Sequence, residues 1–208
     1  MAYYEQSVHD FLEHTGSKAP APGGGSVAAL TASSAAALVE MVANLTIGKK
    51  GYEAVWNDMQ AVADKAASLR HELLLAIDKD SQAFTALLSA FKLPKDKEED
   101  KRKRIAAIQE ATKQAALVPY EMGRQAYSLF ALAEEVIQKG NTMAVTDGAI
   151  AVINAHAAIK AAFLSVRINT KSIKDKAFVA SVEKEMQHLE EGAQKEEKRL
   201  LKLLADRI

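Results

Sequence analysis

The sequence predicts an all-α fold, a single-domain bundle of long helices over residues 1–208. Only four prolines and ten glycines interrupt the chain, and no segment alternates Val, Ile or Thr with polar residues as a strand would. Long segments instead place apolar side chains every three or four residues, the spacing of one helical face. Two predicted helices are alanine-rich and apolar on nearly every side, so we expect them to pack together at the centre.

Composition and charge exclude several classes of function. The 27 basic and 27 acidic side chains give a formal net charge of zero, which favours neither nucleic acid nor a membrane surface as a partner. There is no cysteine, and the five histidines are not spaced as metal ligands, so we predict no metal site. His156 lies on a predicted buried helix, either as a base or, more simply, as a hydrogen-bonded core or interface residue. The absence of cysteine and of a signal-peptide pattern predicts a cytoplasmic protein.

The first elements are a short helix, a glycine-rich turn and a buried helix. Residues 3–14 have amphipathic spacing, and the prolines of 20–26 then hold the chain extended before three glycines. Ser26 is a good N-cap residue, so we expect a helix over 27–45 to follow it. That helix approaches the length of a membrane span, but Glu40 and the abundant alanine favour burial inside protein.

A long helix is predicted over residues 52–91, after a turn at 46–51. Asp80 lies on its apolar stripe, where packing alone favours an aliphatic side chain, whereas Asp78 points to the opposite side. A buried carboxylate is unfavourable without a partner. Asp80 is therefore either a functional acid or a group that caps a neighbouring helix or pairs with an arginine.

Three more helical segments complete the predicted bundle. Residues 92–139 begin with a solvated, mixed-charge loop and continue as a helix that Pro119 should kink. The second alanine-rich helix follows and ends over 167–170. The final helix begins at Ser172 or Asp175, and its Glu- and Lys-rich side is typical of a surface or oligomer-edge helix.

The connections carry the remaining polar candidates. Asp147 stands at the start of the second alanine-rich helix, where an N-cap aspartate needs no further explanation. Asn141 and Asn169 flank that helix at turns, where asparagine is also a common turn former. Lys49 and Lys50 are either solvated charges or ligands for an acidic tail.

Several of these motifs occur in the same order in the cyclodeaminase/cyclohydrolase family, which the chain resembles over nearly its whole length. The family forms the C-terminal domain of formimidoyltransferase-cyclodeaminase and also occurs as stand-alone bacterial enzymes. The matching blocks are Pro22-Gly23-Gly24-Gly25-Ser26-Val27-Ala28-Ala29, Thr46-x-Gly48-Lys49-Lys50, Asp78-x-Asp80-Ser81-x-Ala83-Phe84, Leu93-Pro94-Lys95, Gly140-Asn141, Asp147 and Val166-Arg167-Ile168-Asn169.

The resemblance implies an all-helical homodimer that acts on one-carbon derivatives of tetrahydrofolate, with no cofactor beyond tetrahydrofolate as the substrate carrier. One family reaction closes formimino-tetrahydrofolate to methenyl-tetrahydrofolate and releases ammonia. The other opens methenyl-tetrahydrofolate with water to the formyl compound. We place cyclodeamination first and cyclohydrolysis second, with a non-catalytic folate-binding bundle as the alternative from another class.

Under this resemblance the two aspartates are the predicted catalytic residues. Asp80 would shuttle a proton and favour the developing cation, and Asp147 would act as a second carboxylate or bind pterin nitrogens. The glycine turn would offer backbone N–H groups to the ring edge, the lysines would meet the glutamate tail, and the asparagines would orient polar ring atoms. The alternative for the glycine turn is a simple linker before a core helix. The predicted substrate-binding residues are Gly23, Gly24, Gly25, Ser26, Lys49, Lys50, Asn141 and Asn169.

Overall fold

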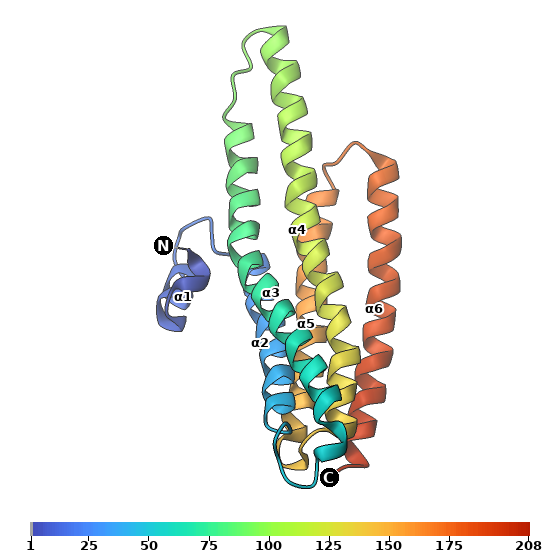
Figure 1. Ribbon diagram of the computed structural model, residues 1–208. Coiled ribbons are helices and arrows are strands. Elements are labelled where there is room, and N and C mark those ends of the chain that lie inside the picture. The colour runs from blue at the N-terminus through green and yellow to red at the C-terminus, as the bar shows by residue number, and fades with distance from the viewer. Residues whose placement is uncertain (1) are drawn as a thin grey trace.

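The computed structural model describes residues 2–208, which form helices and no strand, so the all-α prediction is confirmed. Five long helices lie side by side, and the hairpin of the third and fourth extends beyond the others at one end (Figure 1). A short helix, α1, stands apart at the side of the bundle (Figure 1). The α-helices are α1 (Val8–Thr15), α2 (Gly24–Asn44), α3 (Trp56–Phe91), α4 (Glu98–Lys139), α5 (Val145–Thr170) and α6 (Lys176–Ala205), with 3-10 turns at Tyr3–Glu5, Glu53–Val55 and Thr142–Ala144.

The two alanine-rich helices lie at the centre, as predicted. The α2 helix packs along α3 and α5, and α5 packs along α4. Alanine positions on α2 are almost completely buried, which lets neighbouring backbones approach closely: Ala28, Ala29, Ala32, Ala35 and Ala36. Glu40, the one charged residue of α2, forms an ion pair of 2.6 Å with Arg70 of α3. The charge that interrupts the apolar pattern is therefore neutralised within the bundle.

Pro119 lies buried inside α4 without ending it. Proline has no backbone N–H, so the carbonyl of Ala115, one turn earlier, loses its helical donor. The side-chain amide of Asn169 on α5 donates to that carbonyl at 2.9 Å and to the carbonyl of Ser165 at 2.9 Å. The asparagine thus repairs the defect in α4 and fixes the end of α5 against it.

The predicted boundary of the first helix is wrong. Residues 3–14 do not form one helix, because a 3-10 turn precedes α1, whose N-cap is Ser7. The backbone N–H groups of Tyr3 and Tyr4 donate to the two oxygens of Asp78 at 2.9 and 3.2 Å. Asp78 therefore anchors the N-terminal segment, and it faces away from Asp80 as predicted.

The predicted caps of the two central helices are also wrong, whereas one predicted cap of the last helix is confirmed. The α2 helix starts at Gly24 with Gly23 as N-cap, so Ser26 lies inside its first turn. The α5 helix has Ala144 as N-cap, which places Asp147 in the first turn. Asp175 caps α6 by accepting the N–H of Phe178 at 3.0 Å.

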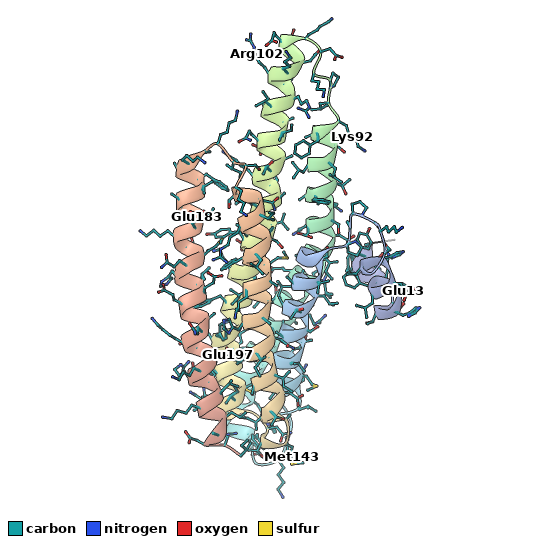
Figure 2. The ribbon with its side chains drawn as sticks, turned by 180° about the vertical axis from the view of Figure 1, so that it is seen from behind. Glu13, Lys92, Arg102, Met143, Glu183 and Glu197 are labelled. Atoms are coloured by element: carbon teal, nitrogen blue, oxygen red, sulfur yellow. The ribbon has the colours of Figure 1, made fainter. Side chains whose placement is uncertain are left out.

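One side of the two central helices is mostly apolar and is not covered by other helices of the described chain. By length and composition alone, α2 and the segment Thr142–Thr170 could span a membrane, with 56% and 50% of their apolar stretches buried in the bundle. Viewed from behind, α5 runs beside α2, with Met143 at the lower end (Figure 2). We call this surface the α2–α5 face; its exposed residues are Val27, Ser34, Met41 and Leu45 of α2 with Ile150, Ile153, Ala157, Lys160, Leu164 and Ile168 of α5, so it is apolar except for Ser34 and Lys160.

Candidate functional site

A pocket of about 250 Å³ lies where α2 begins and α5 ends, between α3 and α4. It brings together residues that are far apart in the sequence. Five of the predicted site residues line it, together with the ring of Phe84: Gly23, Gly24, Gly25, Asp80 and Asn169. The glycine turn, the inward carboxylate and the asparagine that ends α5 therefore share one site.

The carboxylate of Asp80 lies directly against the backbone of Gly25. A Cβ atom at position 25 would stand 2.2 Å from Oδ1 and 2.6 Å from Oδ2 of Asp80, far inside any normal contact. A Cβ at Gly23 or Gly24 would meet nothing within 4 Å. Only the third glycine is required by packing, because it lets α3 place a carboxylate at the N-terminus of α2.

Ser26 holds that carboxylate in place. Its hydroxyl lies 3.2 Å from Asp80 Oδ2 and 3.1 Å from both the carbonyl of Ile77 and the hydroxyl of Ser81. Asp80 thus lies at the first turn of α2 while it lines the pocket.

Burial raises the pKa of the Asp80 carboxyl above its ordinary value, and hydrogen bonding by Ser26 opposes this shift without cancelling it. None of the ion pairs formed within residues 2–208 includes Asp80, so the predicted alternative of an arginine partner is not realised there. A carboxyl with a raised pKa is a stronger base than an ordinary aspartate, which favours proton transfer to and from it. The pocket therefore holds a group suited to proton transfer.

The other predicted site residues lie at the opposite end of the bundle. The 21 residues of α2 separate the two ends by about 30 Å. Lys49 donates to the side-chain oxygen of Asn141 at 2.8 Å, and the N–H of Asn141 donates to the hydroxyl of Thr46 at 2.8 Å. Lys50 is exposed and Asp147 is half-buried in the first turn of α5. We call Lys49, Lys50, Asn141 and Asp147 the far-end group.

Three residues that line the pocket were not among the site residues predicted from the sequence. Ala115, Ser165 and Ile168 line it through the packing of α4 against the end of α5. Pro119 was the available clue, because a proline inside a helix leaves the carbonyl four residues earlier without a donor. That carbonyl belongs to Ala115 and is bound by Asn169.

Two candidates from the sequence lie outside the pocket. His156 bonds to Glu197 of α6 with its Nδ1 at 2.5 Å from Oε2, which agrees with its simpler interpretation as a satisfied residue between helices. Glu197 faces α5 in the view from behind (Figure 2). Over residues 2–208, no group of three or more acidic or histidine side chains is close enough together to hold a metal ion.

The family model described as formiminotransferase-cyclodeaminase matches residues 7–188. The chain belongs to this family. A methenyltetrahydrofolate cyclohydrolase from Methylorubrum extorquens is 42% identical over 184 residues, which are 88% of each chain. The formimidoyltransferase-cyclodeaminase of Sus scrofa is 36% identical over 182 residues, and the match spans 34% of that longer protein.

The fold of this family member also matches a solved structure. The crystal structure of formiminotetrahydrofolate cyclodeaminase from Thermotoga maritima superposes with a TM-score of 0.87 at 30% identity, covering 97% of both chains. Membership in the formiminotransferase-cyclodeaminase family places the chain among the cyclodeaminases and cyclohydrolases of folate one-carbon chemistry, as the resemblance implied.

Proposed function

We propose that this protein is an enzyme that opens the methenyl bridge of methenyl-tetrahydrofolate with water, using Asp80 as the proton-transfer group. The observation that carries the proposal is the Asp80 carboxyl, which has a raised pKa and lies in a pocket at the start of α2. The sequence analysis placed cyclodeamination first. We place cyclohydrolysis first here, and the 42% identity to a cyclohydrolase over nearly the whole chain supports that choice.

The charge of the pocket suits a cationic substrate. The N-terminus of a helix carries a partial positive charge, but here the carboxylate of Asp80 meets it. The pocket therefore presents an anion rather than an empty anion site. The methenyl bridge carries a positive charge between N5 and N10, and a nearby carboxylate stabilises that charge.

Hydrolysis then needs one proton acceptor at the bridge carbon. Asp80 accepts a proton from water as the water oxygen bonds to that carbon, which gives a neutral hydroxyl adduct. The carbon–N5 bond breaks as N5 takes up a proton and the hydroxyl proton leaves, so the products are 10-formyl-tetrahydrofolate and one proton. A raised pKa makes the Asp80 carboxylate a stronger base for the first step and a usable acid for the second.

Asn169 is placed to orient the pterin ring in this proposal. Its amide nitrogen is occupied by the carbonyls of Ala115 and Ser165. No hydrogen bond within the described residues uses its Oδ1 atom, which leaves that oxygen to accept from a ring N–H. Asn169 would therefore bind through oxygen while its nitrogen holds the pocket wall.

Cyclodeamination is the second candidate, favoured by the close match to the Thermotoga maritima cyclodeaminase structure. In that reaction N10 attacks the carbon of the protonated formimino group on N5, and Asp80 moves the N10 proton to the leaving nitrogen. Ammonia departs and the methenyl cation forms. Both reactions pass through a tetrahedral adduct at the same carbon, so one carboxyl serves either of them.

A direct test follows the absorbance of the methenyl compound with purified protein, after subtraction of the uncatalysed rate. We expect rapid loss of the methenyl band, and a band formed from formimino-tetrahydrofolate with ammonia release would instead favour cyclodeamination. The matched control is Asp64→Asn, which changes an exposed aspartate on the same helix and should leave both rates unchanged. If the protein binds folate but accelerates neither reaction, the enzymatic proposal is wrong.

A further inference from the structure

We propose that Tyr3 and Asp78 form a latch that holds the Pro20–Ala21 segment, one wall of the pocket, in position against the folate ring. Both are positioning residues, because neither lines the pocket itself. The inference rests on the proposed function for the identity of the ring. It predicts that the latch controls the affinity for the substrate rather than the rate of the chemical step.

The Pro20–Ala21 segment has few attachments to the bundle. It lines the pocket just before the glycine turn, and the chain reaches it from α1, which stands apart (Figure 1). Over residues 16–22 the described hydrogen bonds join residues at most four positions apart, with one exception. That exception is the hydroxyl of Tyr3, which donates to the carbonyl of Ala21 at 3.1 Å. The position of the segment therefore depends on where Tyr3 is held.

Asp78 holds Tyr3 to α3. Its two oxygens accept the backbone N–H groups of Tyr3 at 2.9 Å and Tyr4 at 3.2 Å, which begin a 3-10 turn where such groups lack partners. A carboxylate that accepts N–H groups forms stronger hydrogen bonds than a neutral acceptor does. The ring of Tyr3 also contacts the ring of His14 edge-on, with 6.3 Å between the centroids. Tyr3 is thus joined to α3, to the end of α1 and to the Pro20–Ala21 segment.

The latch lies directly behind the pocket. A groove of about 400 Å³ runs beside the pocket, and its lining includes Tyr3 and Asp78. Ala21 and Ser81 line both the groove and the pocket. Asp78 lines the groove, whereas Asp80, two residues later on the same helix, lines the pocket. One turn of α3 therefore carries the proton-transfer group on one side and the anchor of the latch on the other.

The Pro20–Ala21 segment offers the folate ring apolar contact only. The side chains of proline and alanine carry no charge and no hydrogen-bonding group, so they stabilise a bound ring by burying its surface. Such contacts are equally strong in the ground state and the transition state, and losing them raises KM while kcat stays unchanged. We therefore expect a displaced segment to weaken substrate binding without slowing the chemical step.

The variant Tyr3→Phe tests the latch, because it removes the hydroxyl and keeps both the ring and the N–H group that Asp78 binds. We expect KM for the methenyl compound to rise about twofold to tenfold, the range that one lost hydrogen bond gives, with kcat unchanged. The Kd of tetrahydrofolate, which neither reaction consumes, should rise by the same factor. The matched control is Tyr4→Phe, which also keeps its N–H bond to Asp78 but removes a hydroxyl that forms no hydrogen bond within residues 2–208. Its KM and Kd should equal those of the wild type.

Variants of Asp78 give a graded test of the same latch. Asp78→Ala removes both acceptor oxygens and should raise KM and Kd at least as much as Tyr3→Phe does. Asp78→Asn keeps one acceptor oxygen, so its KM and Kd should lie between those of Asp78→Ala and the wild type. In the Asp78→Ala background, Tyr3→Phe should add little, because Tyr3 is no longer held where its hydroxyl reaches Ala21. Factors that multiply fully in the double variant would show that the two residues act separately, and would overturn the latch.

The outcomes separate the latch from the proposed reaction. A Tyr3→Phe protein with the KM and Kd of the wild type, or one that loses only thermal stability, would overturn the latch and leave the reaction standing. A loss confined to kcat would also overturn it, because the residue would then act on the chemical step. A wild-type protein that accelerates neither reaction, but binds tetrahydrofolate with a Kd that rises in Tyr3→Phe and not in Tyr4→Phe, would sink only the proposed reaction.

Discussion

The contact between Gly25 and Asp80 gives the sharpest prediction about how the fold holds the site. Replacing Gly25 with alanine places a Cβ atom 2.2 Å from Oδ1 and 2.5 Å from Cγ of Asp80. Relief of that overlap requires the carboxylate to move by about 1 Å, which breaks its hydrogen bonds to Ser26. Overpacking of this kind typically destabilises by about 1–3 kcal/mol.

Helix propensity offsets part of that loss. Alanine in place of glycine in a helix contributes up to about 1 kcal/mol, so we expect Gly25→Ala to lose about 1–2 kcal/mol net. In a protein of this size that is a fall of about 2–8 °C in Tm. We also expect at least a tenfold loss in kcat/KM, because the displaced carboxylate no longer faces the substrate. Thermal melts and the methenyl absorbance assay measure the two effects.

Two comparisons make this prediction specific. Gly24→Ala adds the same atom one residue earlier, where nothing lies within 4 Å, and its stability should be unchanged or slightly higher. In an Asp80→Ala background the clash is absent, so Gly25→Ala should no longer destabilise. Equal losses in both backgrounds, or a Gly25→Ala protein as stable and active as the wild type, would refute the packing argument.

Two further predictions concern pH and the repair of α4. The raised pKa of Asp80 means that the folded state favours its protonated form; this contribution is full below the ordinary pKa and is lost as pH rises through the raised value. Asp80→Asn should therefore gain stability relative to the wild type as pH rises through that range, as measured by urea titrations at several pH values. The acid limb of the wild-type kcat/KM profile should also lie above the ordinary aspartate range. A difference in unfolding free energy between variant and wild type that does not change with pH would contradict this assignment. Asn169→Ala leaves the carbonyl of Ala115 without a donor and should lose about 1–3 kcal/mol in denaturant titrations. In a Pro119→Ala background the restored N–H serves that carbonyl, so the loss should shrink, and an undiminished loss would show that the asparagine acts otherwise.

Helical pattern was enough to predict the bundle and its centre. The all-round apolar character of α2 and α5 required neighbours on most sides, and the inward aim of Asp80 followed from its place on the stripe of α3. These inferences depend on periodicity along one segment, which local sequence determines.

Contacts between distant segments explain what could not be predicted. The sequence favoured Ser26 as the N-cap of α2, but the helix begins at Gly24, three residues before the predicted start. Asp80 reaches that helix end from 54 residues away. The separation of the far-end group from the pocket likewise depends on which ends of the helices meet. Residue type alone contains no information about that choice.

In the proposed reaction Asp80 transfers the proton at the one-carbon bridge, and the turnover of Asp80→Asn, measured beside its unfolding free energy, tests this role. General acid–base catalysis is typically worth about 100-fold to 10,000-fold, so we predict a loss of at least about 100-fold in turnover. The unfolding free energy should stay the same or rise, since the amide avoids the unfavourable burial of a charge. A folded Asp80→Asn protein that turns over methenyl-tetrahydrofolate at the rate of Asp64→Asn would contradict the claim.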